Sequence, residues 1–123
     1  MAATVNVNGR ISNERDAVIS VFDHGFLYGE GIYETLRTYK GRPFLYDRHV
    51  RRLRNSASMI ALTIPFTDEE LSAQIQDTTA AAVLGGEEAY IRVLVTRGVG
   101  ELTYDITATP IPSVVIIVKP LPL

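Results

Sequence analysis

A glycine-rich stretch contains the residues best suited to bind a small ligand. Gly25, Gly29 and Gly31 fall within seven positions, and Tyr28 and Tyr33 accompany them. Glycine tolerates positive φ angles and lets the backbone approach a ligand closely, while tyrosine offers an apolar ring and a hydroxyl. The spacing therefore predicts a loop that lines a small-molecule site.

A cluster of arginines follows, made up of Arg48, Arg51, Arg52 and Arg54. A nucleic-acid surface is disfavoured, because the chain has a formal net charge of -2 and no aromatic residue interrupts the cluster. On the predicted helix, Arg52 lies roughly a third of a turn from the apolar seam. In an isolated domain this arginine is therefore expected to be solvated.

Two histidines, His24 and His49, invite a metal-binding or acid–base interpretation. No cluster of carboxylates with ligand spacing accompanies them, so no metal site is predicted. We expect His24 to shape the glycine-rich loop and His49 to support the start of the helix beside Arg52. Cysteine is absent, which excludes disulfides and thiolate metal ligands.

Length and composition indicate one globular domain. The chain has 123 residues, of which 46% are hydrophobic, enough to bury a core. The N-terminal residues lack the basic and apolar regions of a signal peptide, and the longest apolar run is too short to span a bilayer. A soluble, cytoplasmic protein is therefore expected.

The order of the predicted elements indicates an α+β fold. Asn8-Gly9 predicts a hairpin turn within residues 4–11, and alternation predicts a strand over residues 32–39. On that strand Tyr33 and Glu34 should point to opposite faces. We also expect strands at residues 17–22, 88–96 and 113–118, the last buried on both faces, and a long functional loop at 97–112.

Two helices should cover one side of this antiparallel-rich sheet. The first is predicted from an Asp47 cap to about residue 62, with its buried seam at Val50, Leu53, Ala57 and Ile60. The second begins at a capping box formed by Thr67 and Glu70 and should end near residue 84. On the strand at 88–96, Tyr90 and Arg92 share the face opposite the apolar residues.

The motif DHGFLYGEGIYETLR, followed by HVRRLRNSA, resembles the N-terminal half of class IV pyridoxal-phosphate aminotransferases. The resemblance covers the whole chain, and the family includes branched-chain and D-amino-acid aminotransferases and aminodeoxychorismate lyase. It implies an N-terminal domain at residues 1–118 of a two-domain enzyme and the start of an interdomain linker at 119–123. It also implies a C-terminal domain absent from this chain, and a homodimer.

The resemblance also assigns roles to individual residues. The arginine of the family's H-x-x-R-L motif binds the phosphate of pyridoxal 5'-phosphate, and it matches Arg52. The substrate pocket of branched-chain enzymes matches Tyr28, Tyr33, Tyr90 and Arg92. The partners implied are an amino acid and a 2-oxo acid.

The family's catalytic lysine has no counterpart in this chain. The only lysines are Lys40, in a predicted turn, and Lys119, in the predicted linker. No catalytic residue is therefore assigned, and the chain alone is expected to be inactive. In D-amino-acid aminotransferases an arginine and a histidine trap the substrate carboxylate, and their positions match Leu102 and Tyr104, which favours a branched-chain substrate.

Three functions remain open at this point. The leading one is an aminotransferase that acts on branched-chain-like amino acids. The second is aminodeoxychorismate lyase, which shares the cofactor site. The third is a stand-alone, non-enzymatic domain that dimerises or binds a small anion through Arg52.

Overall fold

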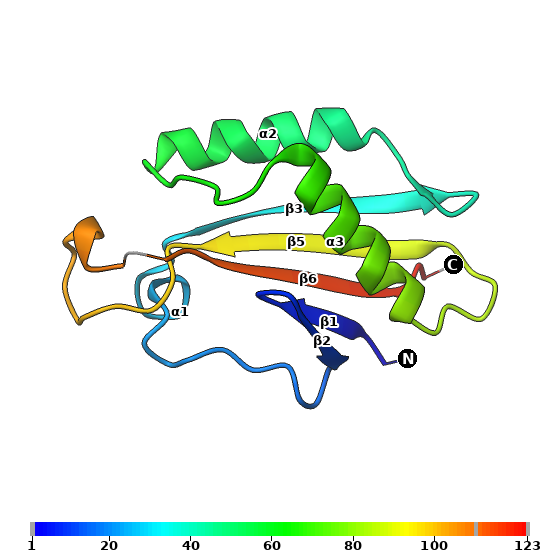
Figure 1. Cartoon of the computed structure of the whole chain (residues 1–123), viewed down its shortest axis with the longest axis horizontal. Helices are drawn as coiled ribbons and strands as arrows, with labels where there is room; N and C mark the ends of the chain where they lie inside the picture. Colours follow the sequence, from blue (N-terminus) through cyan, green and yellow to red (C-terminus); the bar gives the residue numbers. More distant parts are fainter. Residues whose placement is uncertain (1, 110, 123) are drawn as a thin grey trace.

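The structure, a computed structural model, describes residues 2–109 and 111–122. Its centre is a six-stranded antiparallel sheet in the order β2-β1-β6-β5-β3-β4, with α2 and α3 packed on one face (Figure 1). The strands are β1 Thr4–Val7, β2 Arg10–Asn13, β3 Gly31–Tyr39, β4 Arg42–Pro43, β5 Ala89–Thr96 and β6 Ser113–Pro120. The helices are α1 His24–Tyr28, α2 Tyr46–Met59, α3 Asp68–Ala81 and the short 3-10 turn η1 Ile106–Ala108. The α+β expectation is confirmed.

The N-terminal hairpin forms where the sequence predicts it. Asn8 and Gly9 both adopt positive φ angles, of 52° and 93°, as a type I′ turn requires. Val7 then pairs with Arg10 across β1 and β2.

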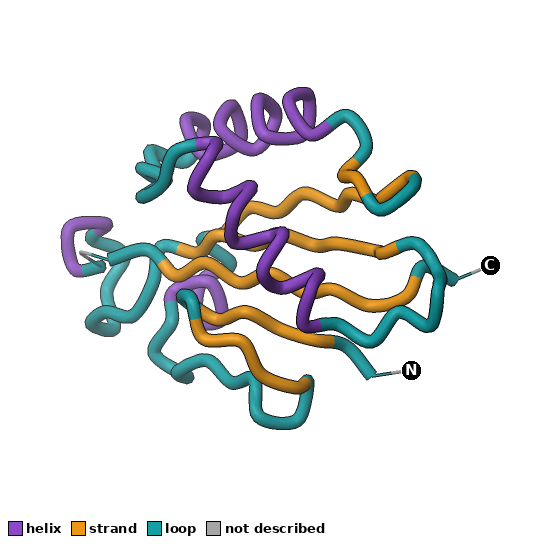
Figure 2. The backbone as a smooth tube through the Cα atoms, turned by 45° about the vertical axis from the view of Figure 1, so that its right-hand side comes forward, coloured by secondary structure: helices purple, strands orange, loops and turns teal. Residues whose placement is uncertain are grey.

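The strand predicted at residues 17–22 is wrong, and Figure 2 draws the whole connection from β2 to α1 as loop. Val18 and Val21 are exposed, because this segment pairs with no strand of the sheet. β-branched residues favour strands only where they can pack against neighbours. The predicted glycine-rich loop instead begins with the single-turn helix α1, which Asp23 caps by accepting a hydrogen bond from the Gly25 N–H at 2.7 Å.

The central strands confirm the predicted alternation. On β3, Glu34, Leu36 and Thr38 are buried beneath the helices, while Tyr33 and Tyr39 are exposed on the opposite face. On β6 the expectation of burial on both faces is corrected. Ile116 and Val118 are buried under the helices, but Ile117 is only half-buried because it points away from α2 and α3, which lie together on one face. The strand also continues through Lys119 and Pro120, residues expected in the linker.

Both helices have the predicted apolar seams but different ends. α2 begins after Leu45, whose φ is 55° and which makes no side-chain cap bond, so Asp47 lies in the first turn and is not the cap. α2 ends at Met59 and leaves Ile60 at its C-cap. The capping box of α3 is confirmed, although this helix ends at Ala81, where Ala82 turns extended with ψ of 144°.

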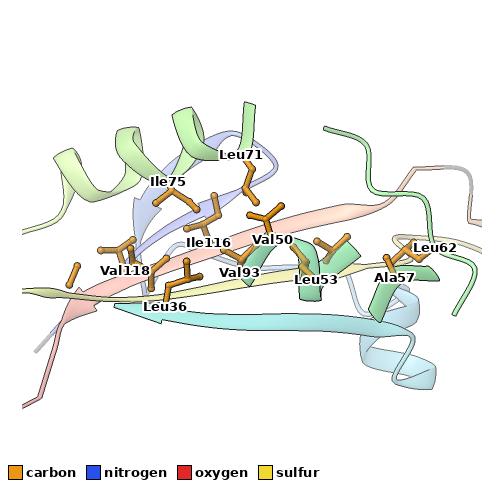
Figure 3. Close-up of a cluster of buried hydrophobic side chains, with 13 residues drawn as sticks. Leu36, Val50, Leu53, Ala57, Leu62, Leu71, Ile75, Val93, Ile116 and Val118 are labelled. Atoms are coloured by element: carbon orange, nitrogen blue, oxygen red, sulfur yellow. The ribbon is translucent and has the colours of Figure 1, made fainter. Parts of the chain in front are cut away.

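The core lies between the two helices and the sheet. Figure 3 shows Leu71 and Ile75 of α3 pointing toward Val50 of α2 and Ile116 of β6. Burying one leucine or isoleucine side chain contributes about 1.5–3 kcal/mol, so this layer fixes the helices over β3, β5 and β6. The positions of residues on α2 relative to β3 follow from this packing.

The segment after β5 is a loop over the described part of residues 97–112, with η1 as its one regular turn there. It lies beside α1 at the opposite end of the sheet from the β3–β4 turn (Figure 1). Within residues 2–109 and 111–122, no helix is long and apolar enough to cross a bilayer. The same ranges contain no group of three or more His, Asp or Glu side chains placed to hold a metal ion.

Candidate functional site

An ion-pair cluster joins β3 to α2 on the helix-covered face. Glu34 accepts hydrogen bonds from Nε of Arg52 at 2.9 Å and from Nη2 of the same side chain at 2.8 Å. Nδ1 of His49 lies 2.8 Å from Oε1 of Glu34. His49 and Arg52 are three residues apart on α2, so both side chains reach the same carboxylate. The two-point contact fixes the orientation of the guanidinium.

Opposing effects set the ionisation of this cluster. Burial would raise the pKa of Glu34, but the hydrogen bonds from Arg52 and His49 outweigh it and hold that pKa below its ordinary value. The hydrogen bond from Arg52 to Glu34 in turn raises the pKa of the guanidinium. A carboxylate only accepts hydrogen bonds, so Nδ1 of His49 carries the proton.

The outer edge of the Arg52 guanidinium remains open. Its side chain is 68% exposed, whereas that of Glu34 is 7% exposed. Glu34 binds Nε and Nη2, which leaves the N–H groups of Nη1 directed at solvent. A fixed, permanently charged donor of this kind suits a phosphate group. The sequence-based expectation that Arg52 is solvated holds for this outer edge only.

Glu34 is the residue that the sequence-based assignment missed. Its place between Ile32 and Leu36 in the buried register of β3 was the available signal. A carboxylate at a core-facing position of a strand requires a partner, because an unpaired buried charge is very costly. The basic residues of the next helix, His49 and the four arginines between positions 48 and 54, were the candidate partners.

On the opposite face of the sheet, Tyr33, Tyr90 and Arg92 come together as expected. Arg92 pairs with Thr35 across β3 and β5, which places it diagonally from Tyr33. Its Nη2 donates to the Tyr90 hydroxyl at 2.7 Å, and its Cζ lies 5.2 Å from the centre of the Tyr33 ring. Nε of Arg92 is buried without a hydrogen-bond partner among the described residues.

Lys119 adds a second cation to this face. It pairs with Tyr90 across β5 and β6, and its Nζ lies 5.2 Å from the centre of the Tyr90 ring. The sequence analysis placed Lys119 in a linker, so it missed this neighbour.

Tyr28 lies on α1, where its ring contacts His24 and Tyr104 at centroid distances of 4.8 and 4.9 Å. No aromatic contact joins Tyr28 to Tyr33 in the described part of the chain. The structure thus unites three of the four predicted substrate residues and places the fourth beside the loop that follows β5.

The two clusters flank one strand edge. β4 pairs with only Thr38 and Tyr39 of β3, so no strand within residues 2–109 and 111–122 pairs with the outer edge of β3 before them. Tyr33 and Glu34 are adjacent there and point to opposite faces. A ligand lying across this edge could contact the Arg52 cluster on one side and the Tyr33, Tyr90 and Arg92 cluster on the other.

Known proteins that resemble this chain in sequence are aminotransferases and a lyase. The chain is 41% identical over 118 residues to a putative branched-chain-amino-acid aminotransferase of Methanocaldococcus jannaschii, a match that covers 96% of this chain and 40% of that protein. It is 35% identical over 106 residues to an aminodeoxychorismate lyase of Bacillus subtilis, covering 82% of this chain and 36% of the lyase. It is also 38% identical over 95 residues to a D-alanine aminotransferase of Listeria monocytogenes, a match that covers 77% of this chain and 32% of that protein. The chain therefore spans less than half the length of these relatives.

Solved structures reproduce the fold. A branched-chain aminotransferase from Thermoproteus uzoniensis with norvaline superimposes with a TM-score of 0.83 at 30% identity, over 99% of this chain and 42% of that one. A branched-chain amino acid aminotransferase from T.th., complexed with N-(5'-phosphopyridoxyl)-L-glutamate, gives a TM-score of 0.84 at 28% identity, over 98% and 41%. The matched part carries the same α+β arrangement.

The sequence model described as amino-transferase class IV matches residues 31–123, a range that includes both clusters. The members of this family depend on pyridoxal phosphate. This chain belongs to the class IV aminotransferase family.

Proposed function

We propose that this chain forms the N-terminal part of an aminotransferase that uses pyridoxal 5'-phosphate. The full-length protein would transfer an amino group between a branched-chain-like amino acid and a 2-oxo acid. The observation that carries this proposal is the exposed Arg52 guanidinium held in one orientation by the buried Glu34 carboxylate.

The residues present fit the phosphate of the cofactor. Arg52 offers the unbound N–H groups of its outer edge, and Glu34 prevents the guanidinium from rotating away. His49 binds the same carboxylate and so holds Glu34 in place from the other side. When bound, pyridoxal 5'-phosphate supplies an electron sink for charge that develops at the α-carbon of the amino acid.

The opposite face would contact the substrate. Arg92 offers a guanidinium that its hydrogen bond to the Tyr90 hydroxyl holds in place, which suits a carboxylate. Tyr33 and Tyr90 provide apolar ring surface beside it. Tyr28 would contribute through the loop after β5, which its ring contacts at Tyr104.

The Schiff-base lysine would come from a following domain. Lys40 lies in the β3–β4 turn, and Lys119 lies against Tyr90 on the face of the sheet opposite Arg52. Because β6 ends only at Pro120, we propose that the first domain extends to that residue rather than to 118 and that a linker begins after it. We also propose a cytoplasmic homodimer as the active form. The greater length of the relatives supports this proposal.

Aminodeoxychorismate lyase is the second candidate, favoured by the 35% identity to the Bacillus subtilis enzyme. A D-alanine aminotransferase is the third candidate, and several relatives at 33% to 39% identity bear that name. The loop after β5 argues against it. Leu102 and Tyr104 stand where the D-specific carboxylate trap is expected, and a leucine side chain cannot bind a carboxylate.

Initial rates of the full-length protein with L-leucine, D-alanine and aminodeoxychorismate separate these candidates. We expect L-leucine to react fastest, with L-isoleucine and L-valine close behind, because an apolar pocket discriminates by only about 1–3 kcal/mol per methylene. A clear preference for D-alanine would overturn the loop argument. Release of pyruvate from aminodeoxychorismate would establish the lyase, and no turnover of any of them would favour a non-enzymatic domain.

A further inference from the structure

A buried polar network lies where β3 begins and β5 ends, outside both clusters of the candidate site. His24, Asp23 and Arg97 are almost completely buried there. Burying such groups costs free energy unless each finds a hydrogen-bond partner. In this network the partners belong to different segments of the chain, so the network holds those segments together.

His24 connects α1 to the loop after β5. Its imidazole is 0% exposed, and Nε2 lies 2.7 Å from the backbone oxygen of Glu101. Its backbone N–H donates to the Gly98 oxygen at 2.8 Å. A carbonyl oxygen only accepts hydrogen bonds, so Nε2 carries the proton and the bond has a defined direction. The free ring nitrogen, Nδ1, lies 4.0 Å from Oε1 of Glu30.

Arg97 fixes the beginning of the same loop. Its Nε pairs with the Glu30 carboxylate, and its Nη atoms donate to the backbone oxygens of Ile60 and Ala61 after α2. The loop is thus tied at Arg97 to the end of the helix that carries Arg52. Backbone hydrogen bonds from the His24 N–H to the Gly98 oxygen and from the Gly100 N–H to the Phe22 oxygen then hold the loop beside α1. The bond from the His24 ring to Glu101 follows them and is the attachment made by a side chain.

The residues held by this bond are the ones expected to select the substrate. Leu102 follows Glu101 directly and Tyr104 is three positions after Glu101, and both side chains are exposed. The Tyr104 ring contacts Tyr28, which in turn packs edge to face against His24 with an interplanar angle of 79°. The His24 side chain therefore supports residues 99–104 in two ways: it binds the Glu101 backbone oxygen, and it packs against Tyr28, which contacts the Tyr104 ring.

We propose that His24 is a positioning residue that fixes residues 99–104 against α1 through the Glu101 carbonyl and thereby sets the substrate range. This inference rests on the proposed function for its effect on catalysis, but its structural part stands by itself. The ligand concerned is the amino acid substrate, whose side chain Leu102 and Tyr104 would meet.

Three variants of the full-length protein test this inference. His24→Leu keeps apolar volume and removes the donor, whereas His24→Gln places an amide N–H where Nε2 lies. His24→Asn places its amide nearer Nδ1, so it stays polar without reaching Glu101, and it serves if the leucine variant does not fold. Amide hydrogen exchange over residues 99–104 and over β5 is measured for each, together with KM and kcat for L-leucine and D-alanine.

We expect exchange over residues 99–104 to rise about tenfold in the leucine and asparagine variants, the factor typical of one lost hydrogen bond, and to remain slow in β5. In these two variants KM for L-leucine should rise while kcat stays nearly unchanged, and the ratio of kcat/KM for L-leucine to that for D-alanine should fall. The glutamine variant should restore both the slow exchange and this ratio. Unchanged exchange over 99–104, an equal rise in β5, or failure of glutamine to rescue would overturn the inference. If the protein transfers no amino group, the proposed function fails while the exchange result still decides the role of His24.

Discussion

Charged residues are paired on one face of the sheet around β3 and lie against tyrosine rings on the other. On the helix-covered face, Glu34 is buried and binds both Arg52 and His49. On the other face, Arg92 and Lys119 lie beside tyrosine rings, and neither forms an ion pair within the described residues. The first face holds one guanidinium in a fixed orientation, while the second presents positive charge to an incoming anion. In the proposed function, the same strand separates the residues that bind the cofactor from those that contact the substrate.

Of the substitutions that separate the two faces of β3, removing the charge of Glu34 should have the largest effect on stability. In Glu34→Gln the carboxylate that orients Arg52 is lost, and the free energy of unfolding should fall by about 1–3 kcal/mol because a buried charge-assisted contact is replaced. Retention of pyridoxal 5'-phosphate should fall as well. Urea unfolding and dialysis of the full-length protein measure the two effects. Glu87→Gln is the matched control and should change neither, because Glu87 is exposed and its side chain forms no ion pair within residues 2–109 and 111–122.

The pH dependence of stability gives a second test of the helix-covered face. The pKa of Glu34 lies below its ordinary value of 4.5, so its contribution is fully present above that pH and is lost as the pH falls further. Urea unfolding at pH 7, 5, 4 and 3 should therefore show that the free energy of unfolding falls more steeply with decreasing pH in the natural protein than in Glu34→Gln. A residual slope will persist, because a hydrogen bond from Thr38 lowers the pKa of Glu88 too. Identical slopes in the two proteins would contradict the ion pair.

Removing the charge from Arg92 tests the other face. Arg92→Met should raise KM for the amino acid about tenfold, since a charged hydrogen bond to the substrate carboxylate is lost, and should leave cofactor affinity unchanged. Arg42→Met, on the short edge strand β4, provides the control. Equal losses of cofactor and substrate affinity in Arg92→Met would mean that the two faces do not act separately.

Tyr33 should show the smallest effect. Its side chain is 60% exposed and contributes its ring beneath Arg92. Tyr33→Phe keeps that ring and should alter KM less than twofold, whereas Tyr33→Leu should raise KM by about twofold to fivefold because the cation–π contact is lost. Steady-state kinetics compares the two, and a larger effect of phenylalanine than of leucine would assign the role to the hydroxyl.

Local signals predicted much of this fold. The Asn8-Gly9 turn, the Thr67 capping box and the alternation on β3 depend on neighbours within a few residues, and all three are confirmed. The strand expected at residues 17–22 failed because pairing is decided by the whole sheet. The cap expected at Asp47 failed because Leu45 takes a positive φ angle, which its residue type does not signal.

The candidate site was predictable to a smaller extent. Motif resemblance supplied the candidates, and their roles stay predictions: Arg52, Tyr28, Tyr33, Tyr90 and Arg92. Strand alternation placed Tyr90 and Arg92 on one face, as the structure has them. Glu34 was missed because its bond to Arg52 joins residues 18 positions apart, on a strand and a helix whose relative placement comes from core packing. Lys119 was missed because proline at 120 favoured a linker, whereas β6 ends only there.

The central claim is that Arg52 binds the phosphate of the cofactor, and the most direct test compares two ligands that differ only in that group. The affinities of the full-length protein for pyridoxal 5'-phosphate and for pyridoxal are measured with the natural sequence, Arg52→Ala and Arg51→Ala. Our account predicts that Arg52→Ala loses at least about tenfold in affinity for pyridoxal 5'-phosphate and keeps its affinity for pyridoxal. Arg51→Ala should keep its affinity for both ligands. Equal losses for both ligands, or unchanged affinity for the phosphorylated one, would contradict it.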